Sequence, residues 1–190
     1  ARNDFWRLKS SYNESFPCVL GKLELNMPAF RNATYSVQQE LYTGTTYLNF
    51  SKDKFSIEIK MYVSAKEDIL IVELKNNGKE PIKGDLILKI ADEETANFES
   101  IMIRGIKQNI QWISRQFDND VEIQSKAACA MKIMDASSNR FILQENENMY
   151  AALTFSSSFK SEDCSQDVLD RVSTIDKKDF YDIFANHKQW

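Results

Sequence analysis

The sequence predicts an all-β fold, a large antiparallel β-sandwich of two sheets with helices at its C-terminal end. Residues 19–91 contain a series of segments in which apolar and polar side chains alternate, which is the period of half-buried strands. Short polar turns join these segments, and no long helical pattern lies between them, so a sandwich is favoured over a parallel α/β sheet. With 190 residues, 43% of them apolar, the chain can bury one large core.

The first half of the chain predicts a meander of strands. Alternation marks residues 20–25, 34–41 and 55–61 as strands with one face on the core. Residues 68–74 form a nearly continuous apolar, β-branched run, which is typical of a more central strand. The sequence Asn76-Asn77-Gly78 then indicates a turn, and alternating Leu86, Leu88 and Ile90 indicate the next strand.

The second half continues in the same way. Strands are expected at residues 110–117, 121–123, 127–134, 140–143 and 149–155, separated by segments rich in Asp, Asn, Ser and Glu. Residues 94–102 fit either a loop or a helical turn. The whole chain is therefore expected to contain about ten to twelve strands.

The pattern becomes helical after residue 158. Ser165 is expected to cap a short helix through Val172, and Thr174 or Asp176 to cap a longer terminal helix. We therefore divide the chain into a β-sandwich domain, residues 1–164, and C-terminal helices, residues 165–190. No Gly, Asn or Pro closes the last helix, so we expect these helices to lead into a following domain. The apolar stripe of that helix consists of Phe180, Ile183, Phe184, His187 and Trp190, and its first part is expected to dock on the sandwich while its last turn is partly exposed.

Composition argues against several classes of partner. Lys and Arg number 24 against 28 Asp and Glu, and no basic block stands out, so nucleic acid is a poor candidate. No run of about 18 apolar residues predicts a membrane span. Three distant cysteines, Cys18, Cys129 and Cys164, match neither a zinc site nor a disulfide scaffold, and we expect them to be buried as small apolar residues.

No catalytic residue, metal site or cofactor site is predicted. The single histidine, His187, has no activated nucleophile near it in the sequence, and five glycines leave no phosphate-binding loop. Paired carboxylates could cleave a glycosidic bond, but the acidic groups at residues 92–94, 118–120 and 162–163 fall where polar loops are expected. The isolated chain is therefore expected to be inactive.

Aromatic side chains are the remaining candidates for a binding site. Exposed aromatic rings stack on sugar faces, whereas strand aromatics in a sandwich more often belong to the core. The candidates for sugar or domain contact are Trp6, Trp112 and Trp190, together with Tyr35, Tyr42 and Tyr47.

The order of features resembles the N-terminal β-sandwich of glycoside hydrolases and phosphorylases whose catalytic domain is an (α/α)₆ barrel, including α-L-fucosidase-like enzymes and maltose phosphorylases. The resemblance lies in residues 20–25, 35–41, 62–74 and 181–190. It implies a galactose mutarotase-like super-sandwich, secreted or periplasmic, that packs against the barrel and shapes one side of its cleft. The family's catalytic carboxylates belong to the barrel, so none is carried over to this chain.

Three hypotheses follow. The first is a non-catalytic accessory domain of a carbohydrate-active enzyme, whose partner is the C-terminal (α/α)₆ barrel of the same protein. The second is a free-standing carbohydrate-binding module that uses exposed Trp or Tyr. The third is a structural or adhesion-type sandwich with no role in sugar binding. Sugar, linkage, and the choice between hydrolysis and phosphorolysis stay open.

Overall fold

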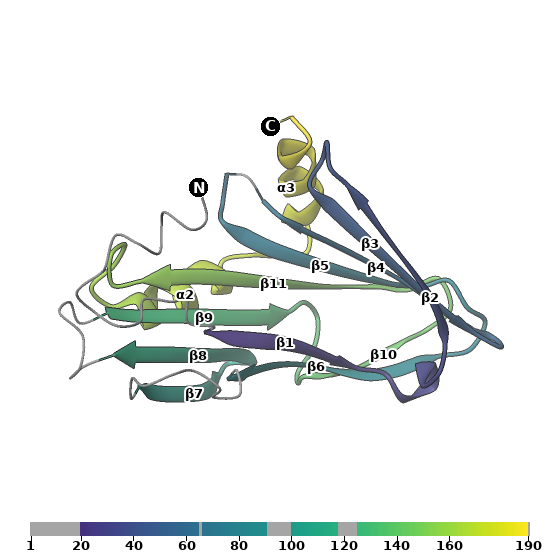
Figure 1. Ribbon diagram of the computed structural model, residues 1–190, viewed down its shortest axis with the longest axis horizontal. Coiled ribbons are helices and arrows are strands. Elements are labelled where there is room, and N and C mark those ends of the chain that lie inside the picture. The colour runs from purple at the N-terminus through teal and green to yellow at the C-terminus, as the bar shows by residue number, and fades with distance from the viewer. Residues whose placement is uncertain (1–19, 65, 91–99, 118–124, 190) are drawn as a thin grey trace, which may run out of the picture.

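The computed structural model describes residues 20–64, 66–90, 100–117 and 125–189. These residues form two antiparallel sheets and two short C-terminal helices, so the predicted all-β sandwich is confirmed (Figure 1). Eleven strands lie in the described residues, within the expected range.

The larger sheet has eight strands. It contains two local meanders, and β11 joins them by pairing with β5 on one side and β9 on the other. In spatial order the strands are β2 (Thr34–Glu40), β3 (Thr45–Lys52), β4 (Phe55–Val63), β5 (Ile69–Asn76), β11 (Asn148–Ser157), β9 (Ser125–Ile133), β8 (Ile110–Phe117) and β7 (Ile101–Lys107).

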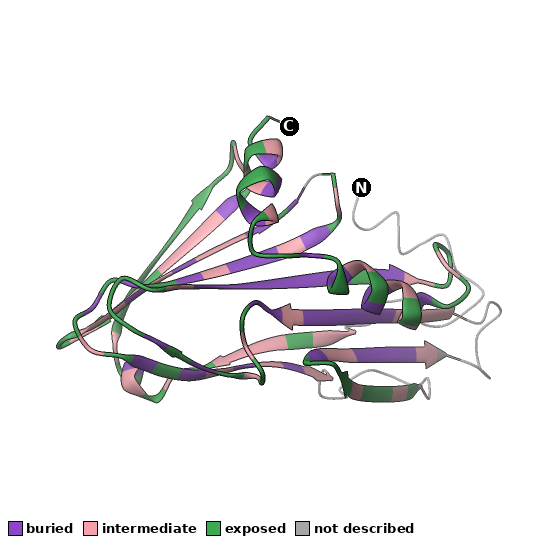
Figure 2. Ribbon diagram, turned by 180° about the vertical axis from the view of Figure 1, so that it is seen from behind, coloured by how far each residue is buried: buried purple, intermediate pink, exposed green. Residues whose placement is uncertain are grey.

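The smaller sheet has three strands in the order β1 (Gly21–Asn26), β6 (Ile82–Ile90) and β10 (Arg140–Leu143). A short 3₁₀ helix, η1 (Pro28–Phe30), follows β1. The main core lies between the two sheets, and the most buried side chains lie on the central strands (Figure 2). Its fully buried members include Leu74, Leu86, Met131 and Leu153.

Asn76 connects the two sheets where β5 ends. Its side-chain amide donates to the carbonyls of Glu80 (3.0 Å) and Leu143 (3.1 Å), and its side-chain oxygen accepts from the backbone N–H of Gly78 (2.9 Å). Leu143 belongs to the small sheet, so this one side chain joins both layers and shapes the predicted turn. Gly78 is required there because a Cβ would lie 2.6 Å from the backbone of Lys54 and Ser56.

Two helices cover the outer face of the large sheet, α2 (Cys164–Ser173) and α3 (Asp179–His187) (Figure 1). Small side chains on β9 and β11, among them Ala130 and Ala152, leave room for Val168 and Val172 of α2. Thr154 also donates its hydroxyl to the carbonyl of Val168 at 2.9 Å. Neither helix is long and apolar enough to cross a membrane.

Most predicted strands are present, and two strands were missed. β8 and β10 have the predicted bounds, while β3 was not predicted and β7 replaces the end of the segment interpreted as a loop or helical turn. The predicted strand at residues 121–123 lies outside the described residues. The chain turns between β3 and β4 at residues 53–54, with Asp53 in a left-handed conformation.

The predicted helix caps were wrong. Asp163, not Ser165, caps α2, because its carboxylate accepts from the backbone N–H of Gln166 at 3.1 Å. Ser165 lies inside the helix. The terminal helix begins at Asp179 and is one residue shorter than α2, so it is not the longer of the two. Thr174 instead ends α2, and the carboxylate of Asp179 accepts from the backbone N–H of Asp176 at 2.8 Å.

The expectation for the exit helix is confirmed in its first part and wrong at His187. Phe180 and Ile183 are buried against the sheet, as predicted. His187 in the last turn is also buried, because its ring stacks on Tyr62 and its Nε2 donates to the carbonyl of Thr43. Lys188 and Gln189 are exposed, and Trp190 lies outside the described residues.

Candidate functional site

The three tryptophans do not form a site within the described residues. Trp6 and Trp190 lie outside them. Trp112 is on β8 and is half-buried. Its indole covers Gly105 on the neighbouring edge strand so closely that a Cβ on Gly105 would lie 2.6 Å from the indole nitrogen. Trp112 therefore supports the end of the sheet by packing.

Exposed aromatic rings lie instead on the β2–β3 side of the large sheet. Tyr42, in the turn between β2 and β3, is 92% exposed, and Tyr35 on β2 is 71% exposed. Tyr35 stacks on Phe50 of β3 with ring centroids 6.0 Å apart, whereas Tyr47 is half-buried. Of the tyrosines proposed from sequence, Tyr35 and Tyr42 thus have the exposure that a contact with another molecule requires.

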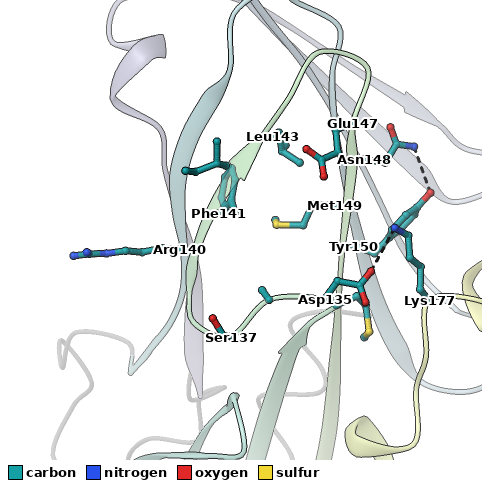
Figure 3. Close-up of a pocket in the computed structure, with 13 residues that line it drawn as sticks. Asp135, Ser137, Arg140, Phe141, Leu143, Glu147, Asn148, Met149, Tyr150 and Lys177 are labelled. Carbon is teal, nitrogen blue, oxygen red and sulfur yellow. Dashed lines mark hydrogen bonds and ion pairs between the residues drawn. The ribbon is translucent and has the colours of Figure 1, made fainter.

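A polar pocket of about 270 Å³ lies where the chain passes from β9 through β10 to β11 (Figure 3). Its floor consists of the buried side chains of Phe141, Leu143 and Met149. Its rim carries Asp135, Ser137, Arg140, Glu147, Asn148 and Lys177.

The rim contacts come from three segments of the chain. Lys177, from the link between α2 and α3, pairs with Asp135 at 3.4 Å, and Asn148 lies 3.4 Å from the hydroxyl of Tyr150. Donors and acceptors around an apolar floor suit a small polar ligand. Sequence reasoning missed this pocket because its residues come from turns and strand ends that show no motif.

A row of polar side chains continues from this pocket across the outer face of the sheet. Glu73 on β5 accepts from the hydroxyl of Tyr150 (3.0 Å) and from the amide of Asn148 (3.1 Å). Its other carboxylate oxygen lies 3.5 Å from Lys60 Nζ on β4. The strand register explains why these side chains lie in a row: Glu73 of β5 is the direct partner of Lys60 on β4 and of Tyr150 on β11. These contacts satisfy the charges of Lys60 and Glu73 beneath α3.

The C-terminal half of α3 rests on this row through aromatic contacts. Lys60 Nζ lies 3.3 Å from the centroid of the Phe184 ring, a cation–π contact. The rings of Tyr62 and His187 are stacked with centroids 4.8 Å apart. Since His187 also donates to the carbonyl of Thr43, α3 is joined to the turn between β2 and β3. The single histidine therefore has a structural role.

Burial alters the acidity of the two tyrosines under α3. Burial, with a further contribution from the negative charge of Glu73, raises the pKa of Tyr150 to about 12, and the pKa of Tyr62 is raised for the same reasons. In the unfolded chain these hydroxyls ionise near the ordinary value of about 10. Above that pH the unfolded chain therefore binds fewer protons than the folded chain, and the free energy of unfolding falls as pH rises.

We expect the free energy of unfolding to decrease between about pH 10 and pH 12, and Tyr150→Phe to make this decrease less steep, since it removes one of the hydroxyls. Denaturant unfolding measured across that range checks the slope. Tyr42→Phe, at an exposed position in the turn between β2 and β3, is the matched control and should leave the slope unchanged. Identical slopes in Tyr150→Phe and the unaltered chain would contradict the assignment.

The interior of the sandwich is open on one side. A groove of about 910 Å³ lies between the small sheet and strands β3, β4 and β5 of the large sheet. Twelve of its fourteen lining residues are apolar, and the other two are Asn26 and Arg31. The amine of Lys52 donates to the carbonyl of Arg31 at 2.8 Å, so the end of β3 is joined to the chain that follows η1. The two sheets thus leave an apolar surface between them that their own side chains do not fill.

The described residues offer little that could carry out a reaction. They contain no group of three or more His, Cys, Asp or Glu side chains that could hold a metal ion. Cys129 and Cys164 are buried free thiols, as predicted, and burial raises the pKa of Cys129 to about 12, so it stays protonated near neutral pH. Cys18 lies outside the described residues.

The acidic groups considered from sequence do not supply a catalytic pair. Of these groups, residues 92–94 and 118–120 lie outside the described part of the chain. Glu162 is exposed, and Asp163 is the cap of α2. No protein-family model matches the chain, and no curated protein matches it either.

Proposed function

We propose that this sandwich is the non-catalytic N-terminal accessory domain of a carbohydrate-active enzyme, a glycoside hydrolase or phosphorylase, and that it packs against a helical-barrel catalytic domain and shapes its cleft. The observation that carries the proposal is that large apolar side chains are exposed both on α3 and on the β2–β3 turn that α3 contacts. The sequence resemblance supplies the enzyme class, and it also implies a secreted or periplasmic protein.

The docking surface consists of Leu41 and Tyr42 in the β2–β3 turn and Tyr181 on α3. Leu41 is 84% and Tyr181 75% exposed. Large apolar side chains exposed together commonly mark a contact with another domain. The contact between His187 and Thr43 joins α3 to the β2–β3 turn, so both elements can present their side chains to one partner.

The coding sequence beyond Trp190 tests the proposed partner directly. The proposal requires several hundred further residues, mostly helical, in the same reading frame. A stop codon immediately after Trp190, or a continuation that is not mostly helical, would contradict the proposed helical-barrel domain.

The isolated chain is expected to hydrolyse no nitrophenyl glycoside above the buffer rate. The physical reason is that the described residues present no activated nucleophile, and that the two carboxylates of the pocket already have partners: Asp135 pairs with Lys177, and Glu147 accepts from the backbone N–H of Gln144. The assay uses a panel of such glycosides, with an active glycosidase as positive control. Turnover that survives repurification, and that is lost in Asp135→Asn or Glu147→Gln, would show that the pocket of Figure 3 is catalytic and would overturn the accessory-domain proposal.

The same pocket favours a second candidate, a carbohydrate-binding module. Its mixture of carboxylate, amide and amine groups over Phe141 and Met149 is suited to a sugar ring. A glycan array followed by calorimetry on the isolated chain tests this function. Binding that is weakened by Lys177→Ala but not by Lys178→Ala, an exposed neighbour outside the pocket lining, supports it. The absence of glycan binding counts against it.

A further inference from the structure

Strand β2 forms one edge of the large sheet, and among the described residues no other strand covers that edge. It pairs only with β3 (Figure 1). All seven of its residues are exposed. In an antiparallel pair, every second residue directs its N–H and C=O groups away from the partner strand. β2 therefore presents a row of backbone donors and acceptors with which a further strand can pair.

The two edges of the large sheet differ in how well they resist such pairing. Natural sheets block an exposed edge with charged side chains, with proline or with a bulge. On the opposite edge, β7 carries Arg104 and Lys107 and is interrupted by Gly105. β2 contains no Lys, Arg, Pro or Gly, and its one charged residue, Glu40, is at its end. Since its register with β3 is continuous, β2 also lacks a bulge, and it is the edge that suits pairing.

The side chains of β2 match a second copy of the same strand running antiparallel. A two-fold register centred on Val37 pairs all seven residues of each strand: Val37 with Val37, Tyr35 with Gln39, Ser36 with Gln38, and Thr34 with Glu40. Tyr35 and Val37, which are 71% and 57% exposed, are the direct partners of two groove-lining residues of β3 and so extend the apolar face of the sheet to its edge. In this register each Val37 lies opposite the other Val37 and diagonal to a Tyr35, and such cross-strand neighbours are stabilising. The opposite face of the paired strands brings together only polar side chains.

The charges at the two ends of β2 also suit this arrangement. Arg31 lies three residues before β2 and Glu40 is its last residue; both are exposed, and neither belongs to an ion pair among the described residues. The amine of Lys52 donates to the backbone carbonyl of Arg31 at 2.8 Å, which adds a second positive charge near the start of the strand. Antiparallel pairing places the negative end of each strand beside the positive start of the other, so two contacts between opposite charges are related by the two-fold axis.

We propose that two copies of this chain associate through their β2 strands, which pair antiparallel about Val37 and join the two eight-stranded sheets. A two-fold contact of this kind uses each β2 edge once, so association ends at a dimer. One strand from each copy makes a small contact, and we expect a dissociation constant in the micromolar range. The inference is independent of the proposed function, because Tyr181, part of the proposed docking surface, takes no part in this contact.

Sedimentation velocity of the chain at about 1 to 500 µM tests the dimer. The mass is expected to rise with concentration from 22.0 kDa to twice that value. Val37→Lys places two ammonium groups opposite each other and should weaken association by at least about tenfold. The matched control, Ile106→Lys, makes the same kind of change at a 76% exposed position on β7 and should leave the dimer unchanged, as should Tyr181→Ala.

Two outcomes of this measurement overturn the proposal. The first is a chain that is monomeric throughout, which would leave the β2 edge to a strand of another protein. The second is a dimer that Val37→Lys does not weaken, which would place the contact elsewhere on the molecule.

A charge exchange tests the antiparallel register. Arg31→Glu and Glu40→Lys are each expected to weaken the dimer by at least about fivefold, because each places like charges at both ends of the contact. The double variant has opposite charges at both ends again and should associate within about threefold of the unaltered chain. The matched control combines Arg31→Glu with Glu162→Lys, an exposed position before α2, and should stay as weak as Arg31→Glu alone. A double variant no tighter than Arg31→Glu, or assemblies of more than two unaltered chains, overturns the pairing about Val37.

Discussion

Asn76→Ala is expected to lower the free energy of unfolding by about 3 to 5 kcal/mol, because the carbonyls of Glu80 and Leu143 lose the amide that donates to both of them. The side chain of Asn76 is fully buried. Its amide donates to the carbonyls of Glu80 and Leu143, and its side-chain oxygen accepts from the N–H of Gly78. A loss of this size is a large part of the total stability of a typical domain, about 5 to 15 kcal/mol. Denaturant unfolding followed by circular dichroism measures it.

The neighbouring residue provides a matched control. Asn77 is exposed, and its backbone N–H donates to the carbonyl of Ser56, a bond that an alanine keeps. Asn77→Ala should therefore change the stability by less than about 0.5 kcal/mol. Asn76→Asp keeps the acceptor for Gly78 but loses both amide donor bonds, so it should also be clearly destabilising. Equal, small effects of Asn76→Ala and Asn77→Ala would show that the two sheets do not depend on this side chain.

Phe180→Ala is expected to cost about 3 to 4 kcal/mol, since it removes a buried ring between α3 and the large sheet. Phe180 stacks on Tyr150 with ring centroids 4.9 Å apart and belongs to the core beneath the two helices. Thermal and denaturant unfolding of the isolated chain measure the effect. Phe184→Ala should cost less, because the ring of Phe184 is only half-buried.

Tyr181→Ala is the matched control for the helix. It makes the same type of change one residue further along α3, on the exposed face, and should cost less than about 1 kcal/mol. If Tyr181→Ala and Phe180→Ala destabilise the chain equally, the helix does not dock on the sheet through the face described. In a longer protein that contains the proposed barrel, Tyr181→Ala should instead weaken the contact between the two domains.

Much of the fold could be predicted because strand periodicity and turn chemistry agree. β8 and β10 each have alternating or apolar residues between polar breaks, and their ends were correct. β3 was missed, although Leu48 and Phe50 face the core, because threonines and Asn49 obscure the apolar pattern. β7 was missed because an edge strand can carry apolar residues on both faces, and Gly105 interrupts it.

The site could be predicted only in part. The tyrosines at positions 35 and 42 were identified, but exposure depends on tertiary packing and could not be deduced from residue type. The pocket of Figure 3 combines residues from the end of β9, from β10 and β11, and from the link between the helices. These segments are distant in the sequence, and their proximity depends on how the two sheets pack. The helix caps failed for a local reason, since Ser and Asp compete for the same backbone donors and Asp163 lies one residue ahead of the helix.

The position of β11 in the middle of the large sheet has a consequence for how this chain folds. The β2–β5 meander and the β7–β9 meander each form from neighbouring segments, so both can assemble from local contacts. β11 joins them by pairing with β5, although the strands β6 to β10 lie between β5 and β11 in the sequence. Closing that long loop costs chain entropy before any pairing compensates for it. We therefore expect completion of the sheet, rather than formation of its hairpins, to limit the folding rate.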